Sequence, residues 1–384
     1  MSIEWNVECT NPCGDSVFVI EKETSLILVY SSKNATISVF SIIGKHIYDF
    51  DTELTLGVTT VTIWNDIIIA GGVDGPIYGY ELSRIMNNMN SNINSNNASN
   101  NNNVSDEQPI KKLEHAFKLE GHFDSVRCMS LCESYLISAG CDFQIILWDL
   151  MKLKHVTNLY ASPSSVRGNE ALANDISFEK DYLFIGHTDG AVCSWNNDNY
   201  KLVVGNLNHT GMEIHSLKTT VQYLICSGKD IHKNHNNIIK IWKDKGKLME
   251  PSYEIVESAY IRSLELFSGV FKGTAIAFAL IAPKEIHVFE IEGDRTLARA
   301  EVVVSSEQNE DVREKQEKGE DEIKINQVIS TFVYHDSKVI TLSTNNGECH
   351  DDNTLSNTIG RNASDNMPVI SYMSFDVLLS HWTK

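Results

Sequence analysis

The sequence predicts an all-β protein built from seven similar units of four short strands. Short runs in which apolar and polar side chains alternate indicate half-buried strands. These runs recur in groups, and each group closes on an aromatic residue. Four closing aromatics follow one another at intervals of 47 residues: Trp148, Trp195, Trp242 and Phe289. The interval is close to the period of about 40 to 45 residues that is typical of four-stranded β-propeller blades.

The third unit is the most complete and extends from residue 119 to residue 150. It contains, in order, Gly121-His122, two strand-like apolar runs, Asp142 and Trp148-Asp149. This pattern resembles the repeat of the WD-repeat (WD40) family, whose signature combines a Gly-His pair with a Trp-Asp pair. Weaker copies extend the resemblance over nearly the whole chain. The resemblance implies a seven-bladed β-propeller of four-stranded antiparallel blades.

The two ends of the chain indicate how such a ring closes. The first two units end at Phe40 and Tyr80, which are 40 residues apart, whereas the seventh ends at Phe375 and supplies only three strands. Residues 3–8, IEWNVE, have the pattern of the missing outer strand. We therefore expect the N-terminal strand to pair with the last blade, because closure removes an exposed sheet edge.

Three polar segments interrupt a single predicted domain, residues 1–384. Residues 86–103 contain 11 Asn in 18 positions, and such a tract cannot offset its ordering entropy, so a disordered loop is expected. Residues 305–324 carry eight acidic and four basic side chains, which favours a solvated loop or a short helix over a binding motif. Residues 348–368 are polar and interrupt the seventh unit.

Composition restricts the class of function. With 32 basic and 51 acidic residues, the net charge is −19, which disfavours direct binding to duplex nucleic acid or anionic membranes. No apolar stretch is long enough for a membrane helix and no secretion signal is visible, so we expect an intracellular protein, cytoplasmic or nuclear, whose eight cysteines are reduced. No cofactor or metal site is expected, and the propeller is predicted to be monomeric.

The resemblance also assigns roles to individual residues of the third unit. It implies that four side chains form a structural hydrogen-bond network: His122, Ser138, Asp142 and Trp148. A catalytic Ser-His-Asp set is disfavoured because no nucleophile elbow is present. The fourth unit has Ile185 and the fifth has Cys226 in place of the serine. The third unit is therefore expected to be the best braced.

The innermost strands carry a polar or basic residue at the same second position: Arg127, Asn174, His215 and Arg262. The resemblance implies that these residues face the mouth of a central channel, with Phe123 and Phe143 on nearby turns. Positive charge there could receive an acidic or phosphorylated segment, since Arg pairs bidentately with carboxylate and phosphate. In the alternative interpretation, these residues hydrogen-bond channel waters and carbonyl groups.

The leading functional hypothesis is a non-catalytic scaffold that binds protein partners as a subunit of a larger complex. One alternative is an enzyme that uses the channel as a substrate pocket, which would need convergent carboxylates or a metal. Another is a substrate-receptor subunit of a cullin-type ubiquitin ligase. The resemblance would then imply an Arg three residues after each closing Trp, but the chain has Met151, Asp198 and Lys245.

Overall fold

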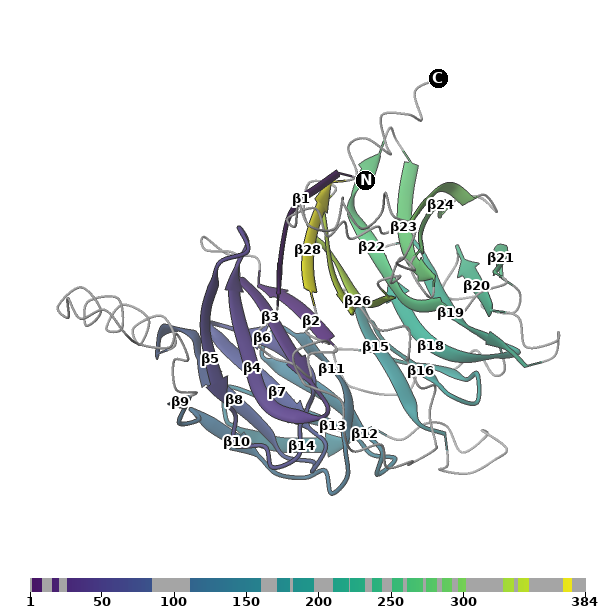
Figure 1. Cartoon of the computed structure of the whole chain (residues 1–384). Helices are drawn as coiled ribbons and strands as arrows, with labels where there is room; N and C mark the ends of the chain where they lie inside the picture. Colours follow the sequence, from purple (N-terminus) through teal and green to yellow (C-terminus); the bar gives the residue numbers. More distant parts are fainter. Residues whose placement is uncertain are drawn as a thin grey trace, which may run out of the picture.

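The computed structural model describes most of the first half of the chain and the strands of the second half (Figure 1). The described residues are 2–8, 16–20, 26–84, 111–159, 171–179, 182–196, 210–220, 222–231, 237–243, 251–257, 261–271, 274–281, 285–291, 296–301, 327–334, 338–344 and 369–374. The three predicted insertions, residues 86–103, 305–324 and 348–368, lie outside the described residues.

Seven sheets are formed within these residues, and we number them 1 to 7 along the chain. Sheet 1 contains β2 (Ser16–Ile20), β3 (Leu26–Ser31), β4 (Asn34–Ser41), β5 (His46–Asp51) and β9 (Lys111–Lys112). Sheet 2 contains β6 (Val58–Trp64), β7 (Ile67–Gly72), β8 (Ile77–Glu81) and β10 (Phe117–Leu119). Sheet 3 contains β11 (Val126–Cys132), β12 (Tyr135–Gly140), β13 (Ile145–Asp149) and β14 (Lys154–Asn158).

The remaining four sheets follow the same order of strands. Sheet 4 contains β15 (Ala173–Glu179), β16 (Tyr182–His187) and β17 (Val192–Asn196). Sheet 5 contains β18 (Met212–Thr219), β19 (Leu224–Asp230), β20 (Asn237–Trp242) and β21 (Tyr253–Glu257). Sheet 6 contains β22 (Ile261–Phe271), β23 (Thr274–Ile281), β24 (Glu285–Glu290) and β25 (Thr296–Glu301). Sheet 7 contains β26 (Gln327–Tyr334), β27 (Lys338–Thr344), β28 (Val369–Ser374) and β1 (Ser2–Glu8).

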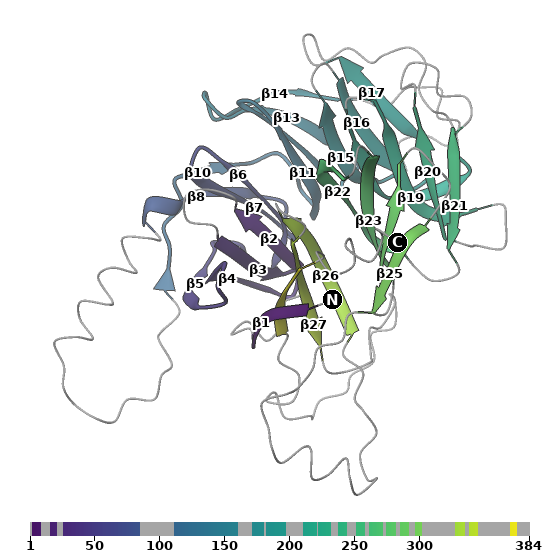
Figure 2. The ribbon, with the colours of Figure 1, turned by 90° about the horizontal axis from the view of Figure 1, so that it is seen from above.

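The first strand of each sheet contacts the first strand of the next sheet. These contacts lead from β2 through β6, β11, β15, β18, β22 and β26, and β26 contacts β2 again. Figure 2 shows the sheets following one another around a common centre. The N-terminal strand β1 pairs antiparallel with β28, with Trp5 opposite Tyr372, so the two ends of the chain meet in sheet 7, as the sequence predicts.

Two sheets depart from the expected four strands within the described residues. Sheet 4 has three, and sheet 1 has a fifth, because β9 pairs in parallel with β5 before the chain enters β10 of sheet 2. The segment 111–119 therefore joins the outer edges of two neighbouring sheets. No helix in the described part of the chain is long and apolar enough to cross a membrane.

The core is divided among the spaces between neighbouring sheets. Successive residues of a strand point to opposite faces, so Leu183 of β16 packs toward sheet 3 while Phe184 packs toward sheet 5. Both faces are covered, which explains why central strands such as β3 and β13 are buried along their whole length. The strict apolar–polar alternation is accordingly weaker in these strands than in half-exposed ones.

A β-bulge recurs near the start of the first strand. Among the described strand pairs, the register between first and second strands shifts around one of the first four residues of β6, β11, β15, β18, β22 and β26. A bulge leaves one residue outside the ladder and re-aims its side chain. The bulged residues are Thr59, Arg127, Asn174, His215, Arg262 and Ile329. Four of them are the residues predicted to face the channel mouth.

Candidate functional site

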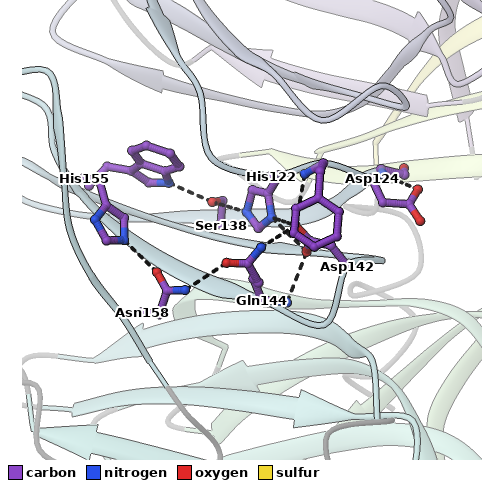
Figure 3. A network of polar contacts seen from close by, with 10 residues as sticks. His122, Asp124, Ser138, Asp142, Gln144, His155 and Asn158 are labelled. Atoms are coloured by element: carbon purple, nitrogen blue, oxygen red, sulfur yellow. Dashed lines mark hydrogen bonds and ion pairs between the residues drawn. The ribbon is translucent and has the colours of Figure 1, made fainter.

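The four residues that the repeat pattern singles out in sheet 3 are joined by hydrogen bonds (Figure 3). The Trp148 indole Nε1 donates to Ser138 Oγ at 2.8 Å, and this hydroxyl lies 2.7 Å from His122 Nε2. The opposite ring nitrogen, His122 Nδ1, lies 2.9 and 3.0 Å from the two carboxylate oxygens of Asp142. The His122 and Asp142 side chains are fully buried. The distances agree with the predicted network, which connects the loop before β11 to β12, β13 and the turn between them.

Two glycines make room for this network. A Cβ atom on Gly121 would lie 2.6 Å from the Trp148 ring, and one on Gly140 would lie 2.5 Å from Asp142 Oδ1 and 2.7 Å from His122 Nδ1. Only a residue without a Cβ allows such close approach. The glycine of the Gly-His pair is thus a packing requirement, because it lets the indole reach the loop that carries the histidine.

The network continues to the outer strand β14, which the sequence did not indicate. Asp142 accepts hydrogen bonds from the backbone N and the Nε2 of Gln144, at 3.1 and 3.2 Å. The Asn158 Nδ2 donates to Gln144 Oε1 at 2.8 Å, and Asn158 Oδ1 lies 2.6 Å from His155 Nε2 (Figure 3). The His155 ring then meets Trp148 edge-on, 5.9 Å between ring centres. Side-chain bonds therefore run across the whole sheet.

Burial and mutual hydrogen bonding leave these residues without an accessible reactive group. Ser138 is fully buried, and both the indole and the imidazole engage its Oγ. A serine nucleophile needs access to substrate and oxyanion donors beside it. The arrangement therefore braces the sheet and does not have the geometry of a catalytic triad.

Sheets 4 and 5 carry other residues where sheet 3 has Ser138. By strand register, the position is Ile185 in sheet 4 and Cys226 in sheet 5. Burial raises the pKa of the Cys226 thiol, so the thiol stays neutral. The Nε1 of the buried Trp242 indole has no hydrogen-bond partner among the described residues. The apolar thiol thus leaves the closing indole of sheet 5 unsatisfied.

Sheet 4 has a buried histidine that sequence reasoning missed. His187 occupies the register position of Gly140, whose Cβ would point into the space filled by His122 and Asp142 in sheet 3. The residue is 3% exposed and burial lowers its pKa, and within the described part of the chain its Nε2 has no hydrogen-bond partner. In sheet 4 an imidazole therefore comes from strand β16 instead of from the loop before the first strand, where the repeat signature places it.

Side chains of three bulged residues form hydrogen bonds to the first strand of the next sheet, from sheet 2 to sheet 5. Thr59 Oγ1 donates to the Val126 carbonyl at 2.5 Å, and Arg127 Nη2 donates to Asn174 Oδ1 at the same distance. The amide Nδ2 of Asn174 donates to the Ile214 carbonyl at 2.7 Å. Each bond joins one sheet to the next. Asn174 is engaged at both ends, so its role is to hold sheets 3, 4 and 5 together.

His215 does not contribute the positive charge that was expected at the channel mouth. Burial lowers its pKa, although Glu213 Oε1 at 3.7 Å from its Nε2 opposes the shift. The imidazole is therefore neutral at pH 7, because desolvation disfavours its charged form. Arg262 occupies the same bulge position in β22, but its side chain lies outside the described part. Of the predicted basic residues whose side chains are described, only Arg127 is charged.

Phe123 and Phe143 flank the Asp142 turn and are exposed to solvent. Phe123 is 76% exposed, although its backbone N donates to Asp142 Oδ2 at 3.2 Å. Phe143 is 49% exposed, and its backbone N donates to the Gly140 carbonyl at 3.2 Å. Two large aromatic side chains are thus presented by backbone that the buried network holds in place.

Among the described residues, no group of three or more His, Cys, Asp or Glu side chains has the arrangement of a metal site. No family model matches the chain, and no curated protein matches it in sequence. Among solved structures, the chain is similar to the computationally designed Ika8 protein, with a TM-score of 0.55 and 14% sequence identity. The match covers 94% of this chain and 96% of the designed one. At this identity the likeness concerns the fold alone.

Proposed function

We propose that the chain is a seven-bladed β-propeller of the WD-repeat type that acts as a non-catalytic scaffold for protein partners. The partners bind the face formed by the loops before the first strands and the turns between the second and third strands. Two features support the architecture: the contacts between first strands return from sheet 7 to sheet 1, and β1 completes sheet 7. The sheet 3 network supports the WD-repeat assignment.

The observation that carries the scaffold function is the exposure of Phe123 and Phe143, on a loop and a turn that the buried network joins. Large aromatic side chains held in place by buried hydrogen bonds bind partners with little loss of conformational entropy, and such residues often dominate interface energetics. The residues that most resemble a catalytic set, Ser138 with His122 and Asp142, are already used to hold this turn. The face is therefore built for contact, and we place the protein within a larger complex, itself a monomer.

Affinity capture followed by mass spectrometry tests this function. We expect wild type to retain a reproducible set of partners, and the Arg127→Glu/Arg262→Glu variant to lose part of that set. Circular dichroism provides the control that the variant folds. Identical partner sets, or no partner above the level of an unrelated bait, would contradict binding at this face.

Limited proteolysis tests the architecture separately. We expect early cleavage within residues 86–103 and 305–324, with the fragments remaining associated on gel filtration, because the sheet contacts form a ring. Dissociation of the fragments into separately migrating pieces would contradict a closed propeller.

A further inference from the structure

We propose that Leu56, Phe123 and Phe143, which we call the apolar arc, bind a short linear protein segment that has an apolar side chain near a carboxylate, which pairs with Arg127. The inference rests on the scaffold function proposed above and places its binding surface off the channel axis, over sheets 2 and 3. Leu56 is 58% exposed, Phe123 76% and Phe143 49%. Exposed apolar residues that gather in one region indicate an interaction site, whereas single ones do not.

Contacts between neighbouring loops link the backbone segments that carry the three residues of the arc. Next to Leu56, Thr55 donates to Asp74 Oδ2 from its hydroxyl at 2.7 Å. Gly75 follows Asp74 and packs closely against the loop before β11. A Cβ atom added to Gly75 would lie 2.5 Å from the His122 carbonyl oxygen. Phe123 comes directly after that carbonyl, and its backbone N is bound by Asp142, the residue before Phe143. The three side chains are therefore carried by three loops, each of which contacts the next.

Phe143 has a backbone conformation that is unfavourable for a bulky residue. Its φ is 62°, in the left-handed region that a bulky residue enters only at a cost in free energy. At the same turn position, sheets 2 and 4 have Gly75 and Gly190, with φ of 98° and 86° and the same hydrogen bond to the residue three positions earlier. Glycine would remove both the strain and the exposed ring. A strained, half-exposed aromatic residue is consistent with selection for contact.

Arg127 supplies the polar half of the site. Its guanidinium reaches Cys141 Sγ at 3.9 Å, next to Asp142, which places it beside the arc. Within the described part of the chain, two of its five N–H donors are used, on Cys141 and Asn174, which leaves donors for a bidentate bond to a carboxylate. A phosphate carries close to two negative charges. With His215 neutral and the exposed Asp124 nearby, the surface matches a carboxylate better than a phosphate.

The test uses the full chain and a phage-displayed library of random twelve-residue peptides. We expect selected peptides to share a large apolar residue and an Asp or Glu within a few positions. A fluorescently labelled selected peptide is then titrated against variants. We expect Phe143→Gly and Phe123→Ala each to raise Kd by about tenfold or more, as for hot-spot residues. Phe143→Gly should meanwhile melt at the same or a higher temperature than wild type, because the strain is removed.

Leu153→Gly is the matched control. Leu153 also has a left-handed backbone, with φ of 50°, and is 46% exposed, but it lies in the turn at the other end of β13. We expect the same or better thermal stability and an unchanged Kd. Replacing the peptide carboxylate by its amide should weaken binding to wild type but not to Arg127→Gln, and phosphoserine in its place should bind no better than the carboxylate.

Three results would overturn the apolar arc: no peptide is selected, the selected peptide keeps its affinity for both Phe variants, or Leu153→Gly weakens binding as much as Phe143→Gly. A phosphoserine peptide that binds tighter would overturn the carboxylate assignment. If affinity capture still returns partners that are lost in Arg127→Glu/Arg262→Glu, the scaffold function stands and only the position of the site is wrong. If capture also fails, the scaffold function itself fails.

Discussion

Sheets 3 and 5 have the same strand register but differ in how they accommodate the buried tryptophan of the third strand. Trp148 and Trp242 are about equally buried, at 2% and 3% exposure, each opposite a leucine of the second strand. Trp148 has a hydrogen-bond acceptor in Ser138, whereas Trp242 faces Cys226 and keeps an unsatisfied Nε1. Packing between sheets is thus sufficient to bury the indole. The hydrogen-bond network adds a further constraint, and it is found where the exposed aromatic residues are presented.

This difference suggests that sheets 3 and 5 have different roles. In sheet 3, the network holds the turn that carries Phe143 and the loop that carries Phe123. In sheet 5, Ile231 occupies the equivalent turn position and is 47% exposed, but the serine of the network is absent. We interpret the complete network as the means by which one region is made rigid enough for binding. The following experiments test that interpretation, beginning with the largest expected effect.

Removing Asp142 should damage sheet 3 most. Asp142→Ala leaves the buried imidazole of His122 and the backbone N of Phe123 and Gln144 without their acceptor. Breaking a buried charged or hydrogen-bonded pair costs about 3–5 kcal/mol, and we expect a loss of this size in the free energy of unfolding. Urea denaturation followed by tryptophan fluorescence measures it. A loss below about 1 kcal/mol would mean that the network adds little to packing.

Serine-to-alanine substitutions compare the two sheets directly. Ser138→Ala removes the acceptor of Trp148 and the partner of His122 Nε2, so we expect a loss of about 2 kcal/mol. Ser227→Ala in sheet 5 is the matched control, because Ser227 is equally buried but its Oγ bonds to none of the residues that the structure describes. We expect it to change stability by less than about 0.5 kcal/mol or to stabilise the protein. Equal losses would show that burial, not the network, decides the cost.

The resemblance to the WD repeat implies the sheet 3 network, and the repeat order predicts the pairing of β1 with β28, because the seventh copy lacks a strand. It cannot predict β9, since two residues after a polar insertion carry no periodic signal. It also misses His187, because an imidazole from the second strand fills space that the signature assigns to a loop residue. The positions of Arg127 and His215 are identified by comparing the innermost strands of the repeats, but the sequence does not show that burial lowers the pKa of His215.

The neutral His187 of sheet 4 should make stability depend on pH. Its pKa is lowered in the folded state, so the unfolded state binds the proton more readily. Neutral His187 makes its full contribution to the free energy of unfolding above its pKa in the unfolded state, about 6.5. This contribution is lost as pH falls through the lowered pKa of the folded state. We expect unfolding free energy to fall between pH 7.5 and 5, with a slope of at most about 1.4 kcal/mol per pH unit from this group.

His187→Phe should flatten this dependence while keeping the apolar volume. Urea denaturation in the same buffers gives the free energy of unfolding of wild type and variant at each pH, and the difference between the two values is compared across the pH range. His215 has a lowered pKa for the same reason and contributes to the slope that remains. Parallel curves would show that His187 does not titrate differently in the folded and unfolded states.

Cys226→Ser gives sheet 5 the acceptor that sheet 3 has. The serine hydroxyl would stand opposite Lys240 in the register that Ser138 has opposite Ile146, within reach of the Trp242 indole. Satisfying a buried donor is worth about 0.5–1.5 kcal/mol, and we expect a gain of that order, measured by urea denaturation. Cys226→Ala, which removes the thiol without adding an acceptor, should instead lose stability by leaving a small cavity. Equal destabilisation by serine and alanine would contradict this prediction. The missing acceptor of Trp242 would then not lower the stability of sheet 5, and the two sheets would differ in packing alone.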